Sequence, residues 1–187
     1  MDGTTGRRVA PAIALVGMPG CGKSTIGRQL ARLRQCPFVD VDHEIERYLG
    51  CEIRTYFERE GEAAFRDVEQ RILGELLMAG EPMVLATGGG AVLREANRAA
   101  LRGGTTVVYL RATPDELARR LARDTSRPLL QVADPRQRLR ELFAVRDPLY
   151  REVAHLSIDT AHRTAMTVAN LLSMQLDMRE PPKEDVE

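Results

Sequence analysis

The sequence predicts an α/β fold in which a five-stranded parallel sheet is flanked by helices. Short apolar runs alternate with helical patterns, a glycine-rich motif joins the first run to the first helix, and 187 residues suit one such domain. Alternation of this kind is typical of parallel strands joined by right-handed crossovers. We therefore expect a single domain over residues 11–178, with a flexible leader at 1–10 and a disordered acidic tail at 179–187.

The expected elements follow from hydrophobic periodicity and from capping residues. Thr113 can cap a helix that has Pro114 at its first position and Glu116 at its third. The segment Asp124–Asp134 has no clear periodicity and the length of a functional loop, so we expect a mobile lid at about 121–135, with an ordinary surface connection as the alternative. The expected strands are Ala12–Val16, Phe38–Val41, Met83–Ala86, Thr106–Leu110 and His155–Ile158. The expected helices are Ser24–Leu33, His43–Leu49, Gly61–Met78, Arg94–Leu101, Pro114–Arg123, Pro135–Glu152 and Arg163–Met178.

The segment from Gly17 to Thr25 fits the phosphate-binding motif G-x-x-x-x-G-K-[ST] and lies between an apolar run and a helical pattern. Its glycines allow successive N–H groups to point at one phosphate, and the following helix presents its positive end. Lys23 is expected to reach the β- and γ-phosphates, and the Ser24 hydroxyl to ligate Mg²⁺. The chain is therefore predicted to bind a nucleotide.

Composition argues against several other classes of protein. Lys and Arg together number 27, as do Asp and Glu, and only 4% of residues are aromatic, so neither a basic field nor a base-stacking surface indicates nucleic acid. No stretch approaches the ~18 apolar residues of a membrane span. Three cysteines without metal-ligand spacing indicate free thiols in a reducing compartment. We expect a cytoplasmic protein that acts on small molecules and, because no long apolar face is left over, a monomer.

Two acidic residues, Asp40 and Asp42, end the second expected strand and should project from one of its faces. In a parallel sheet this position lies beside the phosphate-binding loop. One carboxylate could hold the water shell of Mg²⁺ while the other accepts a proton from an attacking hydroxyl. The structural alternative is that Asp42 caps the next helix.

Further polar groups follow other elements. Three consecutive glycines, Gly88, Gly89 and Gly90, end the third strand, where they allow close backbone approach and offer N–H donors to a ligand. Arg66 and Glu69 are three residues apart on a helix and can pair, which would orient the guanidinium for a carboxylate or phosphate.

The ordered motifs closely resemble those of shikimate kinases from about Ile13 to Leu172. The matching patterns are G-x-P-G-x-G-K-S-T-I-G, D-x-D, F-x-x-x-G-E-x-x-F-R-x-x-E, G-G-G-A-V, R-P-L-L and R-x-P-L-Y. The resemblance implies a P-loop kinase fold and transfer of the γ-phosphoryl group of ATP to the 3-hydroxyl of shikimate, with Mg²⁺ as cofactor.

The resemblance also implies site residues, with the substrate-binding segment at about 42–70. Residues expected at ATP are Gly20, Cys21, Gly22, Lys23, Ser24, Thr25, Arg120, Arg127 and Arg163, and those at Mg²⁺ are Ser24 and Asp40. Residues expected at shikimate are Asp42, Phe57, Phe65, Arg66, Gly88, Gly89, Gly90 and Arg146. The expected catalytic residues are Asp42, Lys23 and Arg127.

Two other interpretations stay open at this point. The chain could be another small-molecule P-loop kinase, such as a gluconate or nucleoside-monophosphate kinase. It could instead be a metabolite-sensing domain that binds without turnover, although Lys23 and Asp42 are both present and no helix-turn-helix extension or basic face accompanies them.

Overall fold

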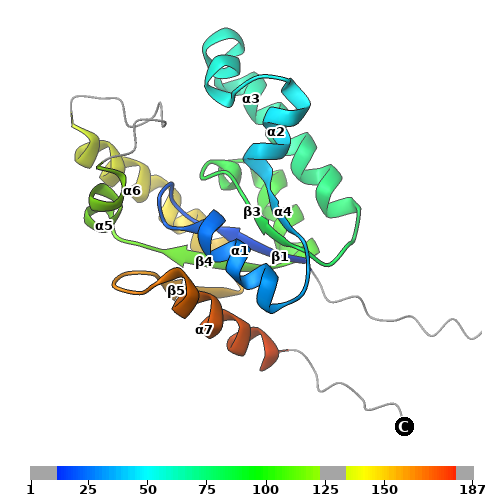
Figure 1. Ribbon diagram of the computed structural model, residues 1–187. Coiled ribbons are helices and arrows are strands. Elements are labelled where there is room, and N and C mark those ends of the chain that lie inside the picture. Colours follow the sequence, from blue (N-terminus) through cyan, green and yellow to red (C-terminus); the bar gives the residue numbers. More distant parts are fainter. Residues whose placement is uncertain (1–11, 123–133, 180–187) are drawn as a thin grey trace, which may run out of the picture.

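The computed structural model describes residues 12–122 and 134–179. The predicted leader, most of the predicted lid and nearly all of the predicted tail lie outside these ranges. The described residues form a parallel sheet with helices on both faces (Figure 1), which confirms the predicted fold class. The five strands, in the spatial order β2-β3-β1-β4-β5, are β1 (Ala12–Val16), β2 (Phe38–Asp40), β3 (Val84–Ala86), β4 (Thr105–Arg111) and β5 (Leu156–Asp159).

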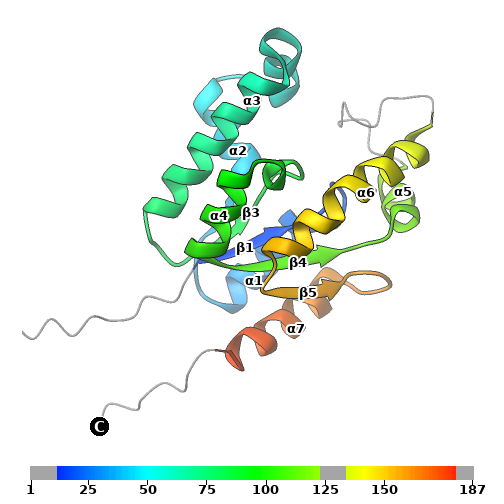
Figure 2. The same cartoon turned by 180° about the vertical axis from the view of Figure 1, so that it is seen from behind.

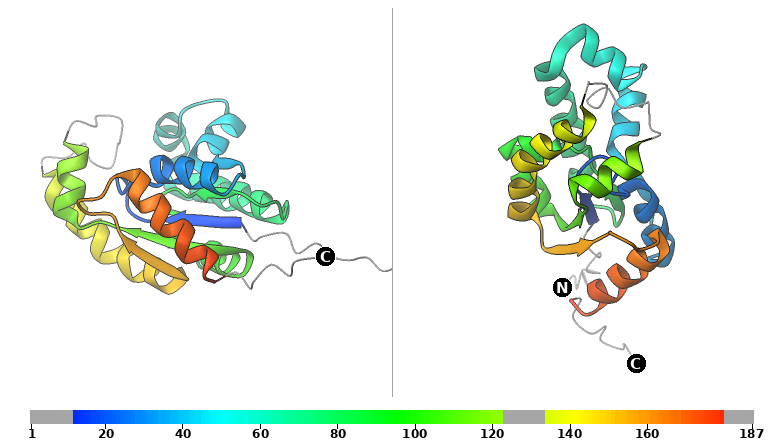
Figure 3. Two further views of the ribbon diagram at one scale, coloured as in Figure 1. Left: turned by 60° about the horizontal axis from the view of Figure 1, so that its bottom comes forward. Right: turned by 90° about the vertical axis from the view of Figure 1, so that its left-hand side faces the viewer.

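The helices form two layers around this sheet. Helices α1 and α7 pack together on one face, and α4 and α6 lie on the other (Figure 3). No helix within the described residues is long and apolar enough to cross a membrane. The helices are α1 (Lys23–Leu33), α2 (Val41–Leu49), α3 (Ile53–Met78), the short 3₁₀ helix η1 (Ala91–Leu93), α4 (Glu95–Gly104), α5 (Pro114–Leu121), α6 (Pro135–Val153) and α7 (Ala165–Asp177).

The sheet aligns the segments that follow its strands. The pairs Leu15–Ala86, Val16–Tyr109 and Asp40–Ala86 are in register. The carboxyl ends of these parallel strands therefore lie side by side along one edge of the sheet. The strands at the centre, β1 and β3, are almost fully buried and anchor that edge in the core. The loop after β1, the turn after β3 and the start of α2 are therefore neighbours.

The prediction that Asp40 and Asp42 share a strand face is wrong. Strand β2 ends at Asp40, whose carboxylate caps α2 by accepting a hydrogen bond of 3.2 Å from the Asp42 N–H. A capping carboxylate satisfies one of the unpaired N–H groups of the first helical turn, which favours helix over continued strand at Val41. Asp42 thus lies in the first turn of α2 and does not cap it.

The helix predicted to start at Gly61 begins eight residues earlier, at Ile53. Its two parts meet at a kink where Gly61 has φ 81° and ψ 175°, a conformation that favours glycine. The first part projects away from the sheet (Figure 2). The predicted cap of α5 is confirmed, because the Thr113 hydroxyl accepts a hydrogen bond of 3.3 Å from the Glu116 N–H.

His155 makes the stability of the sheet edge sensitive to pH. Its Nδ1 accepts a hydrogen bond of 2.9 Å from the Val107 N–H, which requires an unprotonated ring nitrogen. Burial, helped by the charges of Arg102 and Arg179, lowers the pKa of His155 below its ordinary value of 6.5. The stabilising contribution is therefore complete above pH 6.5 and is lost as pH falls through the lowered pKa.

We expect His155→Ala to lower the free energy of unfolding by about 1 kcal/mol near pH 8, because one partly buried hydrogen bond is lost. This difference from the wild type should shrink as the pH is lowered from about 8 through the lowered pKa of His155, because protonation of the wild-type ring breaks the same hydrogen bond. Urea unfolding across this range measures it, with His43→Ala as the control for removal of an exposed histidine. A difference that stays constant with pH would contradict the proposed hydrogen bond.

Candidate functional site

The loop between β1 and α1 has the backbone of a phosphate cradle. Gly17, Gly20 and Gly22 have φ values of 148°, 82° and 100°, which side chains rarely permit. No side chain of the described residues caps the N-terminus of α1, so its first N–H groups remain available to an anion. The Lys23 ammonium donates to the carbonyl oxygens of Gly17 at 2.8 Å and Met18 at 3.1 Å, which places it over the loop.

The remaining predicted phosphate residues belong to the same loop and the first turn of α1. Cys21 is fully buried, with its Sγ 3.9 Å from the Lys23 ammonium nitrogen. Thr25 is exposed on the first turn of α1. The backbone of this segment, more than its side chains, is thus suited to contact phosphate oxygens.

Two oxygen groups next to the cradle suit a hard divalent cation. The Ser24 hydroxyl donates a hydrogen bond of 2.7 Å to Asp40 Oδ2. Within the described residues, no group of three or more His, Cys, Asp or Glu side chains is arranged to hold a metal ion. This sparse oxygen set fits Mg²⁺, which keeps several waters and takes further ligands from nucleotide phosphates.

The three glycines after β3 pack against the other parts of the site so closely that none has room for a side chain. A Cβ on Gly88 would lie 2.7 Å from Asp42 Oδ1 and 2.8 Å from Glu69 Oε1. On Gly89 it would lie 2.8 Å from the Pro19 ring, and on Gly90 only 2.2 Å from Arg66 Nη2. The glycine turn therefore joins α2, α3 and the phosphate loop at one point.

The backbone of this turn offers hydrogen-bond donors to a ligand. The carbonyl oxygens of Gly88 and Gly90 accept hydrogen bonds from Ala91 and Leu93, while Gly89 accepts one of 2.5 Å from the Tyr150 hydroxyl. Within the described part of the chain, the N–H groups of the three glycines donate to no acceptor. They are available to an anionic or hydroxylated ligand.

Two buried arginines differ in their partners. Arg66 is 8% exposed and pairs with Glu69 at 2.6 Å, as predicted, and with Glu62 at 3.2 Å. Arg146 is 4% exposed, and no carboxylate within residues 12–122 and 134–179 forms an ion pair with it. A buried guanidinium without a carboxylate is costly, so Arg146 is suited to an anionic ligand.

Glu69 lies at the centre of these charges. Burial raises the pKa of Glu69, the positive charge of Arg66 opposes this rise, and the nearby charge of Asp42 adds to it. Arg146 acts on the same carboxyl group. Asp42, Arg66 and Arg146, which come from three different helices, are thus brought together as predicted.

The two predicted aromatic residues meet across the kink of α3. The ring centroids of Phe57 and Phe65 are 4.7 Å apart, and the Arg66 guanidinium lies 5.1 Å from the Phe65 ring. The kink at Gly61 brings them together, so these rings form an apolar wall beside the charged groups.

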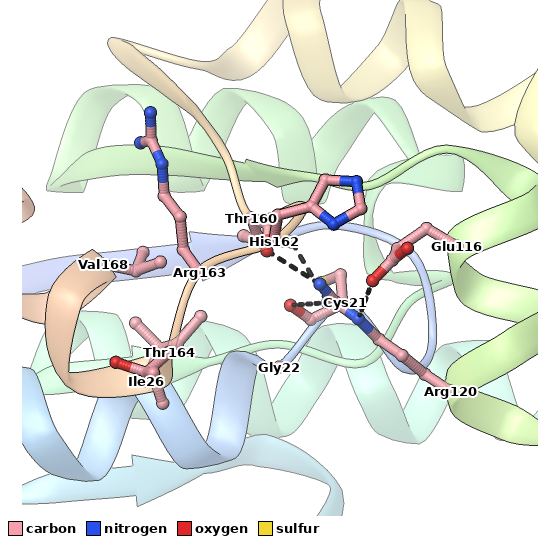
Figure 4. A pocket seen from close by; sticks show the side chains of 11 residues that line it. Cys21, Gly22, Ile26, Glu116, Arg120, Thr160, His162, Arg163, Thr164 and Val168 are labelled. Carbon is pink, nitrogen blue, oxygen red and sulfur yellow. Dashed lines mark hydrogen bonds and ion pairs between the residues drawn. The ribbon is translucent and has the colours of Figure 1, made fainter.

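A cavity of about 390 Å³ adjoins the phosphate loop (Figure 4). Arg120 and Arg163 both line it, as do Thr160 and His162, which sequence reasoning missed. Arg120 is fixed by hydrogen bonds to the Thr160 carbonyl at 2.7 Å and by an ion pair with Glu116 at 3.0 Å. The cavity adjoins Cys21 and Gly22, as a nucleoside site must. Arg127, the predicted lid arginine, lies outside the described residues.

Two further contributions to the site escaped the sequence analysis. The contact of Pro19 with Gly89 could not be foreseen, because it depends on the adjacency of β1 and β3. Tyr150 could have been noticed, since it closes the R-x-P-L-Y motif that contains Arg146.

Comparisons with known proteins agree with these features. A family model described as "Shikimate kinase" matches residues 19–176. Shikimate kinase of Paracidovorax citrulli (strain AAC00-1) is 52% identical over 169 residues, covering 89% of this chain and 92% of that protein. Shikimate kinase of Ralstonia nicotianae is 51% identical over 166 residues, covering 89% and 87%. A solved shikimate kinase from Acinetobacter baumannii, in complex with shikimate, has a TM-score of 0.89 at 45% identity, covering 92% of this chain and 96% of that chain.

Proposed function

This chain belongs to the shikimate kinase family, and on that premise we propose that it transfers the γ-phosphoryl group of ATP to the 3-hydroxyl of shikimate. The observation that carries the acceptor assignment is the buried Arg146, which has no carboxylate partner within the described residues and lies with Arg66 around Glu69. Two guanidinium groups beside an apolar wall suit a ring that bears one carboxylate.

The donor side follows from the cradle. The backbone of Gly20 to Thr25 and the Lys23 ammonium bind the phosphates, and the cavity between Arg120 and Arg163 takes the adenosine. Ser24 would hold Mg²⁺ directly and Asp40 would hold it through water. The bound cation supplies positive charge that offsets the charge developing on the transferred phosphate and on ADP.

The acceptor side is built from α2, α3, α6 and the glycine turn. Arg66 and Arg146 hold the substrate carboxylate, Phe57 and Phe65 wall the ring, and the N–H groups of residues 88–90 bind substrate oxygens. Asp42 orients the 3-hydroxyl and accepts its proton as the oxygen bonds to the γ-phosphorus and the bond to the β-phosphate oxygen breaks. The assignment of Arg127 to the lid, the cytoplasmic location and the monomeric state stay predictions.

The proposed function is tested by ADP release with Mg-ATP and a panel of acceptors. Shikimate should support turnover, and gluconate and nucleoside monophosphates should not, because neither fits both the arginine pair and the apolar wall. Turnover with one of these alternatives and none with shikimate would overturn the assignment.

Arg146→Gln should lower kcat/KM for shikimate by at least about 30-fold, since losing a buried charge partner costs about 2–5 kcal/mol. The KM for ATP should change little, because Arg146 belongs to the acceptor side. Steady-state kinetics with each substrate varied in turn measures both. Arg140→Gln, which removes an exposed arginine of the same helix, is the matched control, and an equal loss in both variants would argue against a specific role.

Gly90→Ala should raise the KM for shikimate by about 10-fold or more, because the added Cβ would lie 2.2 Å from Arg66 Nη2 and displace the guanidinium. Gly74→Ala on α3 is the control, since its Cβ meets no atom within 4 Å. If Gly90→Ala binds shikimate as well as the wild type, the substrate carboxylate is not held by Arg66.

Asp42→Asn should lower kcat by about 10²- to 10⁴-fold, the range expected for loss of a general base. The affinity for Mg-ATP, measured by titration calorimetry, should stay within about twofold, because Asp40 and Ser24 are unchanged. Full activity of the variant would remove Asp42 from the proton transfer.

A further inference from the structure

The glycine turn has one feature that the proposed mechanism leaves unused. The Gly89 carbonyl, unlike those of Gly88 and Gly90, accepts no backbone hydrogen bond within the described residues, and its partner is the hydroxyl of Tyr150 at 2.5 Å. Tyr150 is fully buried and comes from α6, one helical turn after Arg146. A side chain of the acceptor helix thus holds the backbone of the glycine turn.

Peptide geometry makes this contact directional. The Gly89 carbonyl and the Gly90 N–H belong to one planar trans peptide, in which C=O and N–H point in opposite directions. A hydrogen bond that fixes the carbonyl toward the Tyr150 hydroxyl therefore fixes the Gly90 N–H in the opposite direction. Gly89 and Gly90 carry no side chains that would hinder rotation of the peptide between them. The hydrogen bond from Tyr150 therefore selects one orientation of this peptide.

Tyr150 is itself held in place from β4. Its ring stacks on Tyr109 with centroids 5.1 Å apart, and the Tyr109 hydroxyl donates to Asp147 Oδ1 at 2.7 Å. Both tyrosine rings are fully buried. Burial raises the pKa of Tyr150, although the charge of Arg146 opposes the rise, so its hydroxyl remains a donor at neutral pH. The same hydroxyl thus faces Arg146 while it donates to Gly89.

We propose that Tyr150 is a positioning residue which orients the Gly89–Gly90 peptide, so that the Gly90 N–H points at the substrate between Arg66 and Arg146. The inference rests on the proposed function, since the ligand of that N–H is the shikimate carboxylate or a neighbouring substrate oxygen. Tyr150 touches neither reacting atom and acts through the backbone that it holds.

The test is Tyr150→Phe, which keeps the ring stack and removes only the hydroxyl. With saturating Mg-ATP, the KM for shikimate should rise about 3- to 10-fold, as expected for one misoriented hydrogen bond, while kcat and the KM for ATP stay within about twofold. In protein labelled with ¹⁵N-glycine, the Gly90 amide resonance should shift or broaden in the variant without substrate. Tyr48→Phe is the matched control, because it removes the hydroxyl of a half-exposed tyrosine that accepts a hydrogen bond from Arg71.

Two results would overturn the proposal. One is an unchanged KM for shikimate together with an unchanged Gly90 resonance. The other is a fall in kcat together with a rise in the KM values for both shikimate and ATP, which indicates a general structural defect. If the wild type fails to phosphorylate shikimate, the proposed function fails instead, and the Gly90 resonance alone still decides whether Tyr150 orients the peptide.

Discussion

The close contact between the backbone of residues 88–90 and the charged side chains around it is the constraint on which the site depends. A Cβ added to Gly88 would lie within 2.8 Å of the Asp42 and Glu69 carboxylates. A Cβ added to Gly90 would lie 2.2 Å from the Arg66 guanidinium. These glycines do not need unusual φ values, since none of the three has a positive φ. Glycine is required here because of space, whereas Gly17, Gly20 and Gly22 in the phosphate loop are required because of conformation.

This packing explains how two buried guanidinium groups are tolerated. Arg66 is compensated within the protein, because Glu69 is 1% exposed in its side chain and lies 2.6 Å away. Arg146 has no such partner among the described residues and is flanked by the neutral Tyr150 hydroxyl. Breaking a buried charge pair is more costly than never forming one. Under the proposed function, a substrate carboxylate would complete the pairing and would thereby stabilise the folded protein as well.

Sequence alone predicted the parts of this protein that depend on local patterns. The apolar runs located all five strands, and the phosphate loop was predicted from its glycines and lysine. Prediction from the sequence failed where tertiary contacts determine the local structure. The first part of α3 was missed because Gly61 and the polar residues around it resemble a helix start, and because no local pattern reveals the contact of Phe57 with Phe65 across the kink. Asp42 was placed on the same strand face as Asp40 because no local pattern shows that the Asp40 carboxylate caps a helix beginning at Val41.

The relative placement of donor and acceptor is set by strand order rather than by side chains that bridge the two. Because β3 lies between β2 and β1, the glycine turn emerges between the acids at the end of β2 and the cradle at the end of β1. The backbone connects them directly, since the Thr87 N–H donates to the Leu15 carbonyl at 3.1 Å and Gly89 packs against Pro19. Phosphoryl transfer depends mainly on alignment and charge neutralisation, and both are provided at the edge of a rigid sheet. Under the proposed function, side chains on α3 and α6 would determine which acceptor is bound, and the order of the strands would fix the direction of attack.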